Sequence, residues 1–214
     1  ASQRVMYSAR GTSWTASTTA PNNTWQSITY GNGLFVAVAA TTTTSNVMTS
    51  LDGITWTART GATSNLWNSV TYANGLFVAV SSTGTGNRVM TSSDGITWTS
   101  RTSANNNRWT SITYGNGLFV AVSASTTASG QVMTSPDGIT WTARTGSAFN
   151  ASTTVAYGNG LFTIVAATSS VNSILKSYDG ISWSATTSPV ANQWKGLVYA
   201  NGLFVSVANT GTSR

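Results

Sequence analysis

The chain repeats one motif at a nearly constant interval along its length. The segment that starts at Trp25 and reads WQSITYGNGLFVAV returns, with few changes, from Trp67, Trp109, Ser152 and Trp194. Successive starts are separated by 42, 42, 43 and 42 residues. A fixed period of about 20–50 residues is typical of solenoids and propellers, in which each repeat is one supersecondary unit. This repeat therefore limits the possible folds more than any other feature of the sequence.

Each repeat predicts four short strands and no helix, because β-branched residues and glycines dominate and no 3.6-residue apolar stripe persists. The expected strands of the first repeat are residues 25–30, 34–39, 46–50 and 54–59. Asn-Gly joins the first strand to the second in every copy, and Asp-Gly joins the third to the fourth in four copies. Both dipeptides tolerate positive φ and favour tight hairpin turns. A period near 42 with four strands predicts the blade of a β-propeller.

The two ends of the chain predict the number of blades. The sequence opens with the third and fourth strands of a repeat and closes with the first and second. Residues 4–24 and 194–214 number 21 each, which together make one repeat of 42. We therefore expect an all-β, five-bladed β-propeller, closed when the N-terminal third and fourth strands pair with the C-terminal first and second strands. The whole chain, 1–214, is then one domain, with blades at approximately 25–66, 67–108, 109–151, 152–193, and 194–214 plus 1–24.

The turn between the third and fourth strands resembles a known motif. Residues 50–56 read SLDGITW, and similar stretches start at Ser92, Ser135 and Ser177, while Arg10 replaces the aspartate in the stretch that starts at Ser8. This segment resembles the Asp-box, or BNR repeat, of sialidase-type propellers, although Asp and Gly are adjacent here and one residue separates them in the usual motif. The resemblance implies a brace for the turn and no catalytic role.

Composition argues against catalysis. The chain has no histidine, cysteine or glutamate, and its four acidic residues are the aspartates of the recurring turns. The resemblance to sialidases implies a tyrosine nucleophile supported by glutamate, an aspartate and three arginines, and this set cannot be assembled here. Paired-carboxylate hydrolysis needs two acids within about 10 Å, whereas these acids are distributed one per blade. We therefore expect a non-enzymatic protein that uses no cofactor and no metal.

The charge pattern limits the partners. Charged residues make up 7% of the chain, against about 25% in an ordinary domain. The net charge of +6 comes from ten scattered basic residues, with no run of the kind that binds nucleic acid. No apolar stretch approaches the roughly 18 residues of a membrane helix. We expect no nucleic-acid partner and no membrane span.

The candidate ligand-binding residues precede or begin the first strand of each blade, on the side where the loops vary in sequence. An asparagine lies two residues before the strand, which opens with tryptophan in four blades and with Ser152 in the other. Tryptophan offers an apolar face to a sugar ring, and the amide can exchange hydrogen bonds with hydroxyl groups. Alternatively, the asparagine shapes the turn and the tryptophan packs between blades. The candidates are Asn23, Trp25, Asn65, Trp67, Asn107, Trp109, Asn150, Asn192 and Trp194.

These features predict a multivalent binding module for glycans, similar in architecture to five-bladed lectins of the tachylectin type. The alternative is a structural or decoration module of a phage virion, tail or bacterial surface assembly, which the surface rich in Ser, Thr, Asn and Gly resembles. A third hypothesis is a polyanion binder. An extracellular, cell-surface or virion setting is favoured over the cytoplasm.

Overall fold

The computed structural model describes residues 4–125, 130–144, 151–168 and 170–211, which form two compact units, Ala1–Arg101 and Thr102–Arg214. The described residues are all-β and contain no helix. Repeated antiparallel four-stranded sheets confirm the predicted blades.

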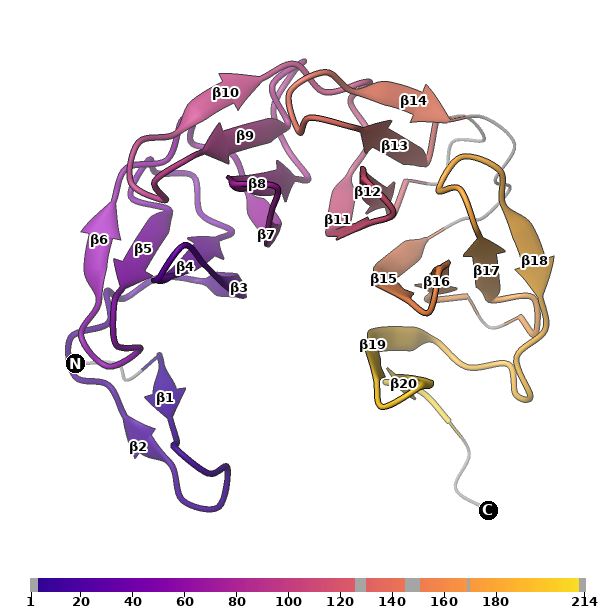
Figure 1. The fold of residues 1–214 in the computed structure, drawn as a ribbon, viewed down its shortest axis with the longest axis horizontal. Coiled ribbons are helices and arrows are strands. Elements are labelled where there is room, and N and C mark those ends of the chain that lie inside the picture. Colours follow the sequence, from indigo (N-terminus) through magenta and orange to yellow (C-terminus); the bar gives the residue numbers. More distant parts are fainter. Residues whose placement is uncertain (1–3, 126–129, 145–150, 169, 212–214) are drawn as a thin grey trace. The chain divides into compact units, whose positions relative to one another are not determined.

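The first unit contains one two-stranded sheet and two blades. The N-terminal half-blade pairs β1 (Met6–Tyr7) with β2 (Thr15–Ala16). Blade one is β3 (Trp25–Gly31), β4 (Leu34–Ala39), β5 (Val47–Ser50) and β6 (Thr57–Arg59). Blade two is β7 (Trp67–Ala73), β8 (Leu76–Ser81), β9 (Val89–Ser92) and β10 (Thr99–Arg101). Blades one and two lie side by side (Figure 1).

The second unit contains two blades and a C-terminal half-blade. Blade three is β11 (Trp109–Gly115), β12 (Leu118–Ser123), β13 (Val132–Ser135) and β14 (Thr142–Arg144). Blade four is β15 (Ser152–Gly158), β16 (Leu161–Ala166), β17 (Ile174–Ser177) and β18 (Ser184–Thr186). The C-terminal half-blade pairs β19 (Trp194–Ala200) with β20 (Leu203–Ala208). The predicted pairing of the two half-blades into a fifth blade therefore remains a prediction.

The turns between first and second strands are the tight hairpins that the sequence predicts. Asn32 has φ 50° and Gly33 has φ 73°, and the other four Asn-Gly pairs adopt similar angles. Both residues therefore occupy the left-handed region that two-residue hairpin turns require. Beside each turn, a cross-strand tyrosine–phenylalanine pair such as Tyr30 and Phe35, with ring centroids 4.6 Å apart, fixes the register.

The Asp-Gly turns differ from the prediction. Only the glycine has a positive φ, as in Gly53 at 74°, and the fourth strand of blade one begins at Thr57 instead of Ile54. The reason is that the aspartate holds the backbone of the two residues after the glycine in a wider loop, which delays strand pairing until Thr49 meets Thr57.

The core lies between neighbouring blades. In the first unit, Val36 and Val38 of β4 pack with Val70 and Phe77 of blade two. In the second unit, Val120 and Val122 of β12 form the same kind of cluster with blade four. The second strand of each of these blades thus carries an apolar row that the next blade covers.

Candidate functional site

The four aspartates are engaged in one repeated hydrogen-bond network. In blade two, Asp94 Oδ1 accepts hydrogen bonds from Ser92 Oγ and from the backbone N–H groups of Ile96 and Thr97, each at 2.8 Å. The Trp98 indole N–H donates to the Gly95 carbonyl at 3.1 Å. The same contacts recur around Asp52, Asp137 and Asp179.

This network keeps the carboxylates ionised. Backbone hydrogen bonds from Thr97 and Ile96, followed by the Ser92 hydroxyl, lower the pKa of Asp94 from 3.8 to about 2. Equivalent bonds lower the pKa of Asp52 and Asp179 to about 2 and also lower the pKa of Asp137. Hydrogen bonds that favour the charged form have this effect. A carboxyl with a pKa near 2 is neither a proton donor nor an effective base at neutral pH.

The candidate asparagines act as clamps at the opposite ends of the strands. In three of the five, the side-chain amide donates a hydrogen bond to a backbone carbonyl of the loop between the second and third strands of its blade. Asn23 binds the Ser45 carbonyl at 2.7 Å, Asn65 binds the Asn87 carbonyl at 2.9 Å, and Asn107 binds the Gly130 carbonyl at 2.7 Å. The three acceptors occupy equivalent repeat positions. The structure thus brings two variable loops together in each of these three blades.

Among the described residues, the amide clamp is not seen at the other two candidate asparagines. The backbone N–H of Asn192 donates to the Val190 carbonyl, and its side chain lies beside Gly211. Asn150 lies outside the described residues.

In blade two, Arg88 also holds the loop between the second and third strands, because its side chain donates to the carbonyls of Gly84 and Ser82 at 2.8 and 2.7 Å.

The four candidate tryptophans divide into a completely buried pair and a half-buried pair. Trp67 and Trp109 are completely buried at 0% exposure, and Trp67 belongs to the cluster between blades one and two. These two indoles offer no exposed face on which a sugar could stack. Trp25 and Trp194 are half-buried, and the Trp25 indole N–H donates to the Pro21 carbonyl at 2.9 Å. Ser152, at the equivalent position of blade four, is buried.

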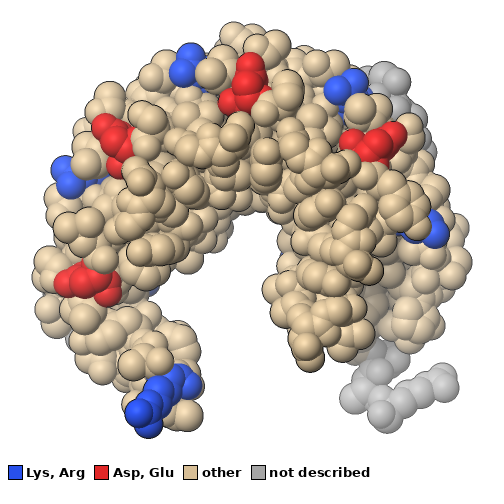
Figure 2. Space-filling model, viewed as in Figure 1, with Lys and Arg blue, Asp and Glu red and all other residues tan. Residues whose placement is uncertain are grey.

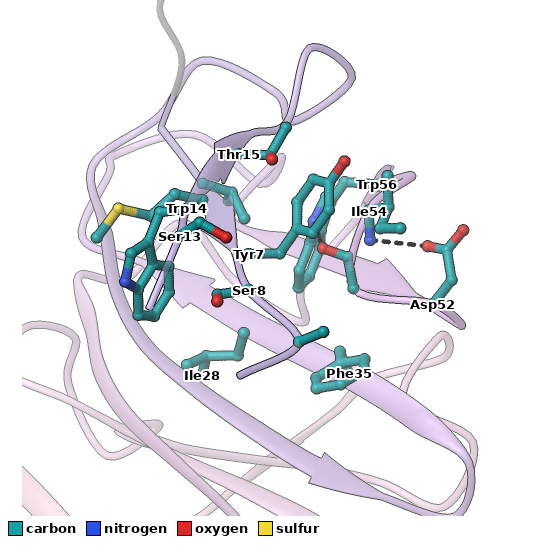
Figure 3. A pocket seen from close by; sticks show the side chains of 14 residues that line it. Tyr7, Ser8, Ser13, Trp14, Thr15, Ile28, Phe35, Asp52, Ile54 and Trp56 are labelled. Atoms are coloured by element: carbon teal, nitrogen blue, oxygen red, sulfur yellow. Dashed lines mark hydrogen bonds between the residues drawn. The ribbon is translucent and has the colours of Figure 1, made fainter. Parts of the chain in front are cut away.

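A pocket of about 660 Å³, which the sequence did not predict, lies beside the N-terminal half-blade (Figure 3). Tyr7 and Trp14 of the half-blade line it together with Ile28, Phe35 and Trp56 of blade one. A second pocket, of about 300 Å³, is lined by Val5 and Met6 of the same half-blade and by Trp25 and Ile28. The incomplete repeat at the start of the sequence could have indicated this pocket, because a half-blade leaves one face of its neighbour uncovered.

Charged side chains form no dense patch on the face that Figure 2 shows, and uncharged residues separate them. The arginine of each complete fourth strand in blades one to three is tied to its own sheet. Arg59 Nε donates to Thr49 Oγ1 at 3.0 Å, and Arg101 and Arg144 make the same bond to Thr91 and Thr134. Among the described residues, no group of three or more acidic, histidine or cysteine side chains could hold a metal ion. No helix of the described part of the chain is long and apolar enough to cross a membrane.

The chain path is similar to that of solved structures with a β-propeller repeat fold. A streptogramin B lyase matches with a TM-score of 0.75 at 11% identity, over 92% of this chain and 66% of that chain. The virginiamycin B lyase from Staphylococcus aureus matches with a TM-score of 0.71 at 14% identity, over 87% of this chain and 64% of that chain. YCF48 bound to a D1 peptide matches with a TM-score of 0.65 at 16% identity, over 87% of this chain and 61% of that chain.

At such identities the likeness concerns the fold alone. The chain spans 55%, 61%, 61% and 64% of the first four solved structures that it matches. No family model matches the chain, and no curated protein matches it in sequence.

Proposed function

We propose that the chain forms a closed five-bladed propeller and acts as a non-enzymatic, multivalent binding module for glycans. The observation that carries the binding role is the amide clamp, which recurs at equivalent positions in three blades and holds variable loops on a repeated scaffold. Recognition generally lies on loops that a rigid scaffold positions. Several near-equivalent sites on one body can gain orders of magnitude in avidity over one site.

Exposed apolar side chains support the closure of the fifth blade. In the first unit, Ile28 is 56% exposed, whereas Val70, at the equivalent position of blade two, is 5% exposed. In the second unit, Leu203, Val205 and Val207 of β20 are 63%, 52% and 64% exposed. Their counterparts in β4 pack against blade two. Blade one and the C-terminal half-blade therefore each expose an apolar surface of the kind that is covered between blades one and two.

The state of the aspartates supports a non-enzymatic role. All four acidic side chains of the chain are hydrogen-bonded acceptors in turns, and they have lowered pKa values. The chain has no glutamate and no histidine that could replace them as acid or base. The lyases among the similar folds share 11–14% identity, so their activity does not extend to this chain by likeness.

Glycans are the ligand class that the loop chemistry favours. The loops beside the clamps are rich in Ser, Thr and Asn, which exchange hydrogen bonds with hydroxyl groups without requiring a charged ligand. Trp25 lines the space that closure of the ring would fill, so the amide and hydroxyl groups of the loops, and not the indoles, carry the proposed recognition.

A structural or decoration module is the second candidate. Exposed apolar rows such as that of β20 fit protein contacts as well as ring closure. Two similar folds were solved with partners, YCF48 with a D1 peptide and a propeller in a nidogen–laminin complex. A module of this class binds an assembled protein partner and no free glycan.

A glycan array at two salt concentrations tests the proposal. We expect hits that survive the higher salt, since uncharged hydrogen bonds are weakly screened, whereas polyanion binding falls steeply. Asn65→Ala should weaken these hits by loosening a loop, and Asn32→Gly, at an exposed turn on the opposite end of the strands, should leave them unchanged. Trp67→Ala is unsuitable as a binding variant because it removes a core side chain. An array without hits contradicts the glycan proposal.

A further inference from the structure

The pocket of about 660 Å³ beside the N-terminal half-blade, from here on called the groove, borders blade one. Next to blade two, side chains of blade one fill the equivalent space. A β-carbon placed on Gly95, in the Asp-Gly turn of blade two, would lie 2.8 Å from a Leu34 methyl and 2.9 Å from a Val36 methyl of the preceding blade. At the equivalent Gly53, the three nearest atoms belong to Phe35 of its own blade, at 3.4–3.8 Å. The missing neighbours of Gly53 correspond to Leu203 and Val205 of β20.

The C-terminal half-blade has the strand register of a complete blade. Its register, in which Tyr199 faces Phe204 and Val198 faces Val205, is the register of the first two strands in every complete blade. The register of β1 and β2 likewise matches that of β5 and β6. Applying the pairing of β4 with β5 to the half-blades places Ser206 opposite Met6. Neither half-blade needs to refold before the two can pair.

Two hydroxyl contacts that join neighbouring blades in the second unit cannot form where the C-terminal half-blade would meet blade one, a junction that we call the seam. In the second unit, Thr110 Oγ1 donates to the Ser152 carbonyl at 3.0 Å, and Ser111 Oγ accepts from the Val155 N–H at 3.2 Å. Thr153 and Thr154 donate similarly to the carbonyls of Trp194 and Lys195. Lys195 and Gly196 stand at these two positions in the C-terminal half-blade, and neither carries a hydroxyl group.

A third contact is missing because of one methyl group. The last residue of the first strand is glycine in blades one, three and four, and a β-carbon on Gly158 would overlap the ring of Tyr199 in the next strand pair. In the C-terminal half-blade this residue is Ala200, whose β-carbon would occupy the place that Tyr30 should take. Ala73 is the other alanine at this position.

We propose that this seam opens and that two copies of the chain exchange their C-terminal half-blades, each β19–β20 hairpin filling the groove beside β1–β2 of the other copy. The proposal rests on the proposed closure, because exchange reuses the same contacts between two chains. A seam that lacks three contacts opens at lower cost than the junction of blades three and four, and the exchanged dimer recovers every apolar contact of the closed ring. Exchange of an identical element is a low-cost route to a dimer.

Cysteine pairing in this cysteine-free chain tests the exchange. The variant Met6→Cys/Ser206→Cys is oxidised at low and high protein concentration and analysed by non-reducing mass spectrometry. We expect disulfide-linked dimers whose fraction rises with concentration. The control Met6→Cys/Val205→Cys places the second thiol on the opposite face of the strand, and it should not pair. Monomeric disulfides alone overturn the exchange and leave closure intact, whereas no specific disulfide at any concentration overturns both.

Repair of the seam provides the second arm. The variant Lys195→Thr/Gly196→Ser/Ala200→Gly places the residues of blade three at the seam, and it should slow the rate of dimer formation about three- to tenfold, because opening must then break one or two added hydrogen bonds. Ala73→Gly, the same methyl deletion in an internal blade, should leave the rate of dimer formation unchanged. Equal rates of dimer formation in the repaired and unmodified chains contradict the role of the seam.

Discussion

The ring of Tyr72 in β7 lies directly against Gly31 in β3, so that a β-carbon on Gly31 would overlap Tyr72 Cγ. Gly115 and Tyr157 repeat this contact in the second unit, as do Gly158 and Tyr199. The glycine thus sets how closely the first strands of two neighbouring blades approach each other.

Gly31→Ala should therefore destabilise the first unit. The added methyl forces the Tyr72 ring and its strand to move, and overpacking of this kind costs about 1–3 kcal/mol. Gly31→Ser should cost more, because its side chain is larger. Urea unfolding curves measure both changes, and an unchanged midpoint for both variants would show that the contact is not restrictive.

The aspartate of each turn should contribute measurably to stability. Asp94→Ala leaves the N–H groups of Ile96 and Thr97 without their acceptor, which should cost about 1 kcal/mol, as removal of a helix cap does. Arg10→Asp is the matched gain, because the Gly11–Ser8 and Trp14–Gly11 contacts of its turn are already present. Thermal unfolding should show a lower Tm for the first variant and a higher Tm for the second; a lower Tm for Arg10→Asp would contradict the assignment.

Acid should destabilise the protein over a defined range. The pKa of Asp52, Asp94 and Asp179 is about 2 in the folded chain, below the value of 3.8 for a free aspartate. A lowered folded pKa stabilises the protein above the unfolded pKa, and this stabilisation is lost as the pH falls from about 4 to about 2. Urea midpoints between pH 5 and pH 2 measure the loss. A variant with all four aspartates replaced by asparagine should show a flatter profile, and equal profiles would contradict the account.

The repeat period and the turn dipeptides were sufficient to predict the blades, because each repeat is one four-stranded unit and each dipeptide determines the conformation of its own turn. Asn32-Gly33 requires positive φ at two residues, and Leu34–Ala39 was predicted with the bounds that β4 has. The start of β6 was not predictable from strand propensity, since Asp52 organises the residues before it through side-chain bonds.

The candidate site was predicted less well. The alternation of the strand could not show that Trp67 lies completely inside, because its burial depends on Val36 and Val38 of another blade. The position of Asn65 before the strand was visible, but its bond to the Asn87 carbonyl joins two loops that are distant in sequence. Contacts of that range depend on the packed blade and not on a local pattern.

Loss of an amide clamp should loosen a loop and leave the core intact. Asn65→Ala removes the bond to the Asn87 carbonyl, so backbone amides of residues 82–88 should exchange with solvent faster. Amides of β8 and β9 serve as the internal control and should be unaffected. Hydrogen exchange followed by mass spectrometry measures both regions, and unchanged exchange in the loop would remove the clamp from the proposed binding platform.

Hydrogen exchange of β20 tests most directly whether the half-blades complete a fifth blade. In blade one, β4 pairs with β3 on one side and with β5 on the other. A completed blade predicts that the amides of Leu203–Ala208 are all protected to the level of those in Leu34–Ala39. Alternating protection, with every second amide of β20 exchanging like an unpaired strand edge, would contradict the closed five-bladed propeller.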